Sequence, residues 1–186
     1  MKQKGIICIE TEWQITTRVN KRNLNTEPLL KFIGNSYGIP YIYRKVATKE
    51  ELTYYLNQFH KKEFEKYEIL YFSFHGNTQK ISLENGEQLS LEDLSNIANG
   101  LFENRFIHFS SCRTLLGSDN ILKNFKTNCG AKMVTGYTKS VATDLSATHD
   151  IALLQQILTK KHLPSIIRNM DKLYGGLEKE LGFKFL

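Results

Sequence analysis

Short apolar runs alternate with segments of helical periodicity along the whole chain. The apolar runs are typical of buried strands and lie at residues 5–9, 41–46, 67–74, 105–110 and 132–136. Apolar residues at helical spacing predict helices at 26–37, 48–61, 91–101, 118–128, 144–160 and 164–181. Residues 80–91 alternate around an Asn-Gly turn, which predicts a small hairpin, and the polar residues 10–25 predict a loop.

The regular alternation of strands and helices indicates the fold class. It predicts an α/β domain with a mainly parallel central sheet flanked by helices, which is a three-layer sandwich. Thr26, Thr48 and Ser90 each precede a predicted helix, as N-cap residues do. The chain has 186 residues, and no repeat, low-complexity tract or linker divides it. We therefore expect one domain over residues 1–186.

Composition and charge narrow the classes of function. Hydrophobic residues make up 41% and charged residues 24%, a globular mixture that excludes a disordered or fibrous protein. The net charge of +6 is spread along the chain, so it allows an acidic partner without requiring one. No apolar segment has the length of a membrane span, and the three cysteines lack metal-ligand spacing. We expect a cytoplasmic protein with free thiols and with no membrane contact, metal or other cofactor.

Two further binding classes lack their sequence signals. A dinucleotide or P-loop site needs a glycine-rich turn after the first strand, where residues 10–13 read ETEW instead. A nucleic-acid site would rest on Arg18, Lys21 and Arg22, but three charges in a polar loop are more typical of a solvated surface. We therefore expect neither a nucleotide nor a nucleic acid as the ligand.

Two chemically reactive residues follow the ends of predicted strands. His75 comes after the third strand and Cys112 after the fourth, and ligands of open α/β sheets bind at such strand ends. A neighbouring imidazole turns a thiol into a nucleophile and can later protonate a leaving group. The backbone N–H groups of Gly76 and Cys112 would serve as oxyanion donors. We interpret the remaining cysteines and histidines as core or surface residues: Cys8, Cys129, His60, His108, His149 and His162.

The motifs around these residues resemble a known family. The string FSFHGN is followed by a hairpin, a helix and IHFSSCRTLLG, a combination that resembles the caspase-like (clan CD) cysteine peptidases and is most similar to their CHAT branch. The resemblance extends through AKMVTGY and the long helix after it, covering about residues 67–158. It implies a caspase-like sandwich with a small hairpin after the His-bearing strand. It also implies a cysteine endopeptidase with Cys112 as nucleophile, His75 as base and acid, and a protein or peptide substrate.

The resemblance also suggests where the substrate side chain would bind. In caspase-like peptidases, the end of the first strand and the strand after the nucleophile build this pocket. Here these places hold Glu10, Glu12 and Asp144, and Ser110 adjoins the nucleophile. Carboxylates there would favour cleavage after a basic residue. The same acidic residues are also typical of solvated loops and helix starts, where Asp144 would favour a helix N-terminus.

A second interpretation stays open at this point. His75 and Cys112 are closer in sequence than the roughly 50 residues that separate the pair in caspases, and the caspase signature around the cysteine is absent. A catalytically inactive caspase-like domain that acts as a protein-interaction module would carry the same fold. The sequence leaves the oligomeric state open.

Overall fold

The computed structural model describes residues 4–12 and 25–186. Within them, the strands are β1 (Ile6–Thr11), β2 (Tyr41–Val46), β3 (Ile69–Ser73), β4 (His75–Asn77), β5 (Lys80–Ser82), β6 (Gln88–Ser90), β7 (Phe106–Ser110), β8 (Met133–Tyr137) and β9 (Phe183–Phe185). The helices are α1 (Glu27–Tyr37), α2 (Lys49–Gln58), the short 3-10 helix η1 (Lys62–Phe64), α3 (Leu91–Ala98), α4 (Asp119–Cys129), α5 (Thr143–Thr159) and α6 (Leu163–Leu181). Arg18, Lys21 and Arg22 lie outside the described residues.

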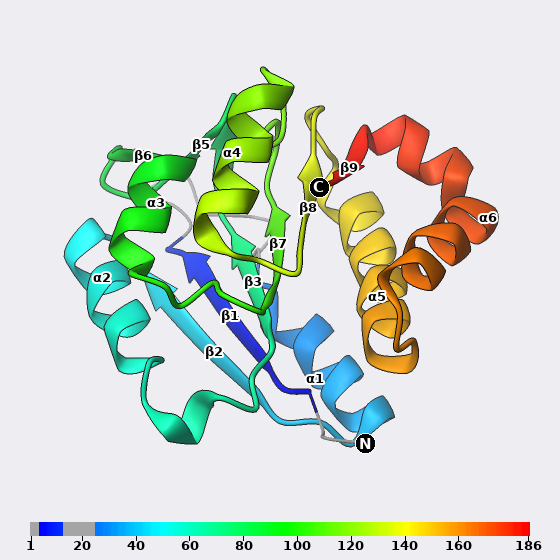
Figure 1. The fold of residues 1–186 in the computed structure, drawn as a ribbon, viewed down its shortest axis with the longest axis horizontal. Helices are drawn as coiled ribbons and strands as arrows, with labels where there is room; N and C mark the ends of the chain where they lie inside the picture. The colour runs from blue at the N-terminus through cyan, green and yellow to red at the C-terminus, as the bar shows by residue number, and fades with distance from the viewer. Residues whose placement is uncertain (1–3, 13–24) are drawn as a thin grey trace.

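A mainly parallel sheet forms the centre of the molecule (Figure 1). Its strand order is β2-β1-β3-β7-β8-β9, and all neighbouring pairs are parallel except β8 and β9. The predicted α/β class with a mainly parallel sheet is therefore confirmed. The sequence pattern missed β9, because a three-residue strand is too short to establish a period of two.

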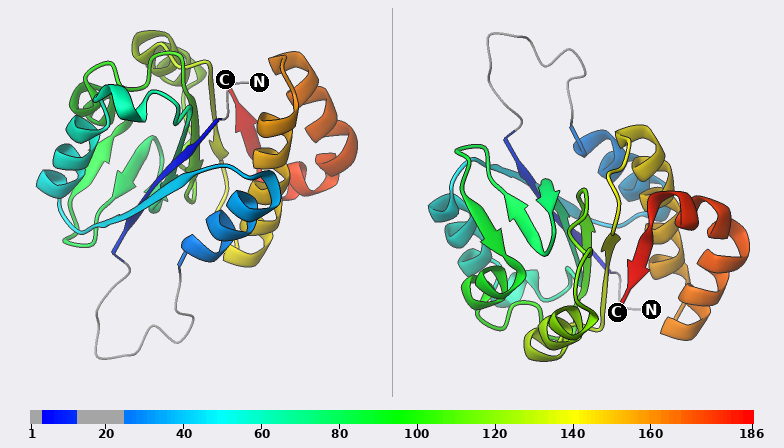
Figure 2. Two further views of the ribbon diagram at one scale, coloured as in Figure 1. Left: turned by 90° about the horizontal axis from the view of Figure 1, so that it is seen from below. Right: turned by 90° about the horizontal axis from the view of Figure 1, so that it is seen from above.

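Helices cover both faces of this sheet (Figures 1 and 2). Helices α2, α3 and α4 pack on one face, whereas α1 and α5 pack on the other, with α6 against α5 and β9. Successive strand residues point to opposite faces, so each strand contributes to two cores. In β3, for example, Leu70 and Phe72 belong to the first core and Ile69 and Tyr71 to the second. The result is a three-layer sandwich.

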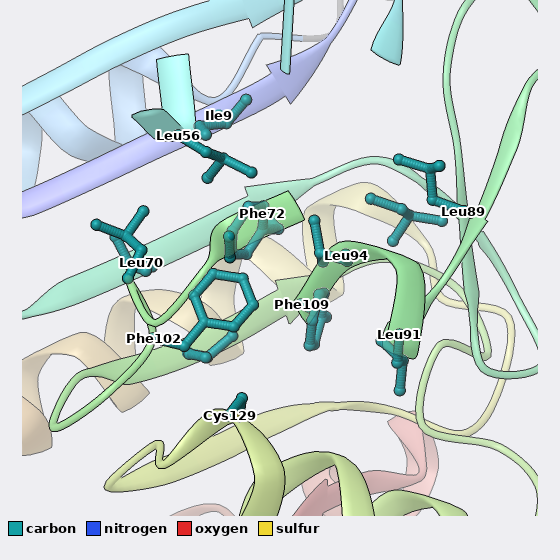
Figure 3. Close-up of a cluster of buried hydrophobic side chains, with 14 of the residues drawn as sticks. Ile9, Leu56, Leu70, Phe72, Leu89, Leu91, Leu94, Phe102, Phe109 and Cys129 are labelled. Atoms are coloured by element: carbon teal, nitrogen blue, oxygen red, sulfur yellow. The ribbon is translucent and has the colours of Figure 1, made fainter. Parts of the chain in front are cut away.

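Aromatic rings fill the centre of the first core (Figure 3). Phe72 of β3 stacks on Phe109 of β7, with ring centroids 5.5 Å apart, and meets the edge of Phe102 at 5.8 Å. Leu94 of α3 is fully buried in the same core. This packing fixes β3 and β7 side by side and so positions the residues that follow their ends.

A second, antiparallel sheet follows β3 directly. It has the order β4-β5-β6, so the predicted hairpin over 80–91 is confirmed and gains one more strand. The apolar strand over 67–74 ends at Ser73, and the next strand, β4, begins at His75. The sequence did not reveal β4 because its three residues, His-Gly-Asn, carry no alternation.

All three predicted N-cap positions are confirmed, and two of them form side-chain caps. Thr48 and Ser90 each form a reciprocal capping box with the third helical residue, Glu51 and Asp93 respectively. Thr26 is the N-cap residue of α1, as predicted, but its side chain forms no cap bond. Its hydroxyl instead donates to Glu10, a buried carboxylate that accepts a charge-assisted hydrogen bond.

Candidate active site

His75 and Cys112 follow the ends of neighbouring parallel strands. In the register of β3 and β7, Ser73 pairs with Ser110, and each reactive residue lies two positions beyond its member of this pair. Both residues line the same cavity, which has a volume of about 260 Å³. The structure therefore brings together the two residues that sequence reasoning placed at adjacent strand ends.

Gly76 packs against the loop that carries Cys112. A Cβ atom on residue 76 would lie 2.1 Å from the carbonyl oxygen of Cys112 and 2.4 Å from Thr114 Oγ1. Side chains cannot approach backbone so closely, so this contact needs glycine. The contact holds the start of β4, with His75, against the turn after β7.

The three cysteines differ in their surroundings. Cys8 and Cys129 are buried, and burial raises the pKa of both thiols. Cys112 is partly exposed in the cavity, where its sulfur accepts a hydrogen bond from the Val141 N–H at 3.4 Å. As predicted, Cys112 is therefore the most accessible of the three thiols.

The His75 ring forms part of the cavity wall. The residue is exposed overall, but partial burial of the ring lowers its pKa below the ordinary value. A lowered pKa keeps the imidazole neutral near pH 7, which is the form that accepts a proton.

The sequence-predicted carboxylates do not share one location. Glu10 lines the cavity and is 1% exposed, and Ser110 lines it as well. Glu12 lies beyond β1 and pairs with Lys45 at 3.2 Å, and Asp144 is exposed in the first turn of α5. Neither of these two is among the described residues that line the cavity, so they do not join the pair at the site.

Glu10 is held by hydrogen bonds from three elements. Its carboxylate accepts bonds from the Thr26 backbone and hydroxyl, from Ser73 Oγ at 3.2 Å and from the Tyr43 hydroxyl. Burial and the bond to Glu10 raise the pKa of Tyr43 well above its ordinary value, so Tyr43 stays a donor. Glu10 therefore anchors α1 and β2 to the cavity wall.

A buried network behind the cavity was missed by sequence reasoning. Asp150 of α5 is fully buried, and its carboxylate accepts bonds from His108 Nε2 at 2.7 Å and from Ser110 Oγ at 2.7 Å. The hydroxyls of Tyr71 and Tyr137 donate to it at 2.5 Å each. The signal was present in the helical pattern, because Asp150 shares a stripe with the buried residues of α5 at 146, 153 and 157.

The described part of the chain holds neither a metal cluster nor a membrane-spanning helix. Over residues 4–12 and 25–186, no group of three His, Cys, Asp or Glu side chains is arranged to hold a metal ion. No helix in these ranges is long and apolar enough to cross a membrane.

Comparison with known proteins gives the family and no activity. None of the curated proteins matches the sequence. One family model matches residues 3–186, and its description reads "Family of unknown function (DUF6642)". Because the match spans nearly the whole chain, the protein belongs to this family.

Proposed function

We propose that this protein is a cysteine endopeptidase with a caspase-like sandwich fold. The observation that carries the proposal is the shared cavity of His75 and Cys112 at the ends of adjacent parallel strands. The small sheet that follows the His-bearing strand supports the caspase-like assignment, because the sequence resemblance implies a hairpin at this place. The accessible Cys112 thiol and the lowered pKa of His75 support the chemistry.

The proposed reaction proceeds in two steps. His75 takes the thiol proton of Cys112, the sulfur attacks the scissile carbonyl carbon, and the backbone N–H groups of Gly76 and Cys112 stabilise the oxyanion. His75 then gives its proton to the leaving amine, and the acyl group stays on the sulfur. Water attacks the acyl carbon while His75 takes one of its protons, and that proton returns to the sulfur as the C–S bond breaks. The new carboxylic acid leaves and gives its proton to the solvent.

The proposal includes a preference for a basic residue before the cleaved bond. Glu10 lines the cavity, Asp150 lies directly behind two lining residues, and no lysine or arginine is among the described lining residues. Arg113, next to the nucleophile, is exposed and is not one of them. This cavity therefore favours a cationic side chain, with Glu10 rather than Glu12 or Asp144 as the carboxylate at the wall.

Peptide hydrolysis and thiol labelling together test this function. The full chain and its Cys112→Ala variant are compared on fluorogenic peptides, with Cys129→Ala as the matched control that removes a buried thiol. We expect hydrolysis by the wild type and by the control, and none by Cys112→Ala. If the wild type hydrolyses no peptide and Cys112 reacts no faster than the buried thiols, the non-catalytic interaction module replaces this proposal.

A further inference from the structure

The carboxylate of Asp150 receives four donors at its two oxygens. Oδ1 accepts from His108 and Tyr137, and Oδ2 accepts from Tyr71 and Ser110, all at 2.5–2.7 Å. Four bonds fill the lone-pair positions of a carboxylate. Two of the four donors, Tyr71 and Ser110, also line the cavity, so the network connects the core of the molecule to the candidate site.

The ionised state of Asp150 decides the direction of these bonds. Burial raises its pKa, but the charge and hydrogen bond of His108 and the bonds from Tyr137 and Tyr71 outweigh burial and lower it to about 2. An ionised carboxylate only accepts hydrogen bonds. Each tyrosine or serine hydroxyl has one proton, so both Tyr71 and Ser110 direct that proton to Asp150.

With their protons directed to Asp150, the oxygens of these two hydroxyls are left as hydrogen-bond acceptors. Ser73 lines the same cavity. Its hydroxyl donates to Glu10 at 3.2 Å, so its oxygen is also left as an acceptor. Three hydroxyls of the wall thus have their protons turned toward two buried carboxylates.

We propose that Asp150 is a positioning residue, which orients the hydroxyls of Ser110 and Tyr71 so that the cavity wall accepts hydrogen bonds and selects a side chain rich in N–H donors. The inference rests on the proposed function in one respect, namely that this cavity holds a peptide side chain. The inference adds the residues that would bind that side chain. It also gives a reason, beyond charge alone, why a basic side chain is preferred. A guanidinium offers five N–H donors and no acceptor, whereas the ureido group of citrulline has the same shape, no charge and an acceptor oxygen.

Binding of capped amino acids tests the proposal without any turnover. Acetyl-arginine amide and acetyl-citrulline amide are titrated into the full chain, and the amide resonances of Ser110 and Ala147 report binding at the cavity. We expect the wild type to bind the arginine probe about tenfold more tightly than the citrulline probe, since hydrogen bonds to charged groups contribute on that order. Equal binding of the two probes, or binding of neither, would overturn the proposal.

Variants separate orientation from general stability. Ser110→Ala removes one acceptor and leaves Asp150 with its other three donors, and we expect the arginine-to-citrulline ratio to fall about threefold or more. Ser110→Thr restores a hydroxyl that can donate to Asp150, and we expect it to recover part of the ratio that Ser110→Ala loses. Asp150→Asn introduces a donor that releases the hydroxyl protons, so the ratio should approach one in the folded variant. An unchanged ratio in Ser110→Ala contradicts the proposal even if Asp150→Asn does not fold.

These outcomes distinguish the inference from the proposed function. If the probes bind with the expected ratio and no peptide is hydrolysed, the peptidase proposal fails and the assignment of Asp150 stands. If peptides are hydrolysed and Ser110→Ala keeps the full discrimination, the assignment of Asp150 fails and the peptidase stands.

Discussion

Gly76 and Cys112 are in backbone contact: a Cβ atom on residue 76 would lie 2.1 Å from the Cys112 carbonyl oxygen. Gly76 of β4 and the turn after β7 thus hold each other in place. Thr114 and Ser111 surround the same point, at 2.4 Å and 2.9 Å from the Cβ position. The spacing between the His75 and Cys112 backbones therefore depends on a residue without a side chain.

The first prediction concerns this contact. Gly76→Ala forces the small sheet away from the Cys112 loop, and overpacking of this kind costs about 1–3 kcal/mol. We expect a lower free energy of unfolding together with slower labelling of Cys112. The matched control is Gly176→Ala in α6, where an added Cβ meets no atom within 4 Å, so stability should stay equal or rise slightly. Equal effects of both substitutions would contradict the structural role of Gly76.

The second prediction concerns thiol reactivity. Cys112 should be alkylated faster than Cys8 and Cys129 at neutral pH, because burial raises the pKa of the other two thiols. Mass spectrometry after timed iodoacetamide treatment gives the rate for each cysteine. His75→Ala should slow the labelling of Cys112, whereas His162→Ala, at the exposed start of α6, should leave it unchanged. Similar rates for all three thiols would contradict the assignment of Cys112 as nucleophile.

The third prediction concerns pH-dependent stability near α6. His149 Nε2 and Glu178 Oε1 are buried 3.8 Å apart, and neither atom has a hydrogen-bond partner among the described residues. Because the Tyr137 proton goes to Asp150, His149 donates from Nδ1 to Tyr137 at 3.1 Å, and its Nε2 is an acceptor. Burial lowers the pKa of His149 to about 4, so this form holds at neutral pH.

Glu178 then determines the sign of the pH effect. Burial, with the negative charge of Asp171, raises the pKa of Glu178 above its ordinary 4.5. A raised carboxyl pKa contributes stability that is present below pH 4.5 and is lost as the pH rises through the folded-state value. Glu178→Gln offers a neutral N–H donor to His149 at every pH and should flatten this decline.

Urea unfolding at a series of pH values measures this difference. At pH 7 the free energy of unfolding of Glu178→Gln should equal or exceed that of the wild type. Glu180→Gln is the control, since Glu180 is exposed two positions away on the same helix. Parallel pH profiles for the wild type and Glu178→Gln would show that the buried pair does not titrate as described.

Much of the sheet and the reactive pair could be predicted because the information is local. An apolar run marks each central strand, and the polar residues that end it mark the functional edge. The buried network could not be assembled in this way. Asp150 takes its donors from β3, β7 and β8. The register that places Tyr71 beside His108 is set by packing rather than by sequence spacing.

The two acidic residues at the end of β1 also differ in a way that depends on the folded structure. Glu10 and Glu12 are two positions apart and look equivalent in sequence, but β1 ends between them at Thr11. Glu10 is consequently buried beside the cavity, whereas Glu12 continues alongside β2 to meet Lys45. The end of β1 is therefore what separates Glu10 in the cavity from Glu12 in a surface ion pair. The sequence locates such a strand end only to within a few residues.

The last prediction concerns cleavage specificity. It tests Glu10, with Glu12 and Asp144 as controls. A fluorogenic peptide panel varies only the residue before the cleaved bond, and we expect arginine and lysine to be preferred over aspartate. A charged hydrogen-bonding partner is worth about 1.5–3 kcal/mol, or roughly tenfold or more in selectivity. Glu10→Gln should reduce the preference because it removes the charge at the cavity wall while keeping the shape. Glu12→Gln and Asp144→Asn should leave it unchanged, since neither residue lines the cavity. A preference for aspartate, or equal losses in all three variants, would show that the selecting charge lies elsewhere.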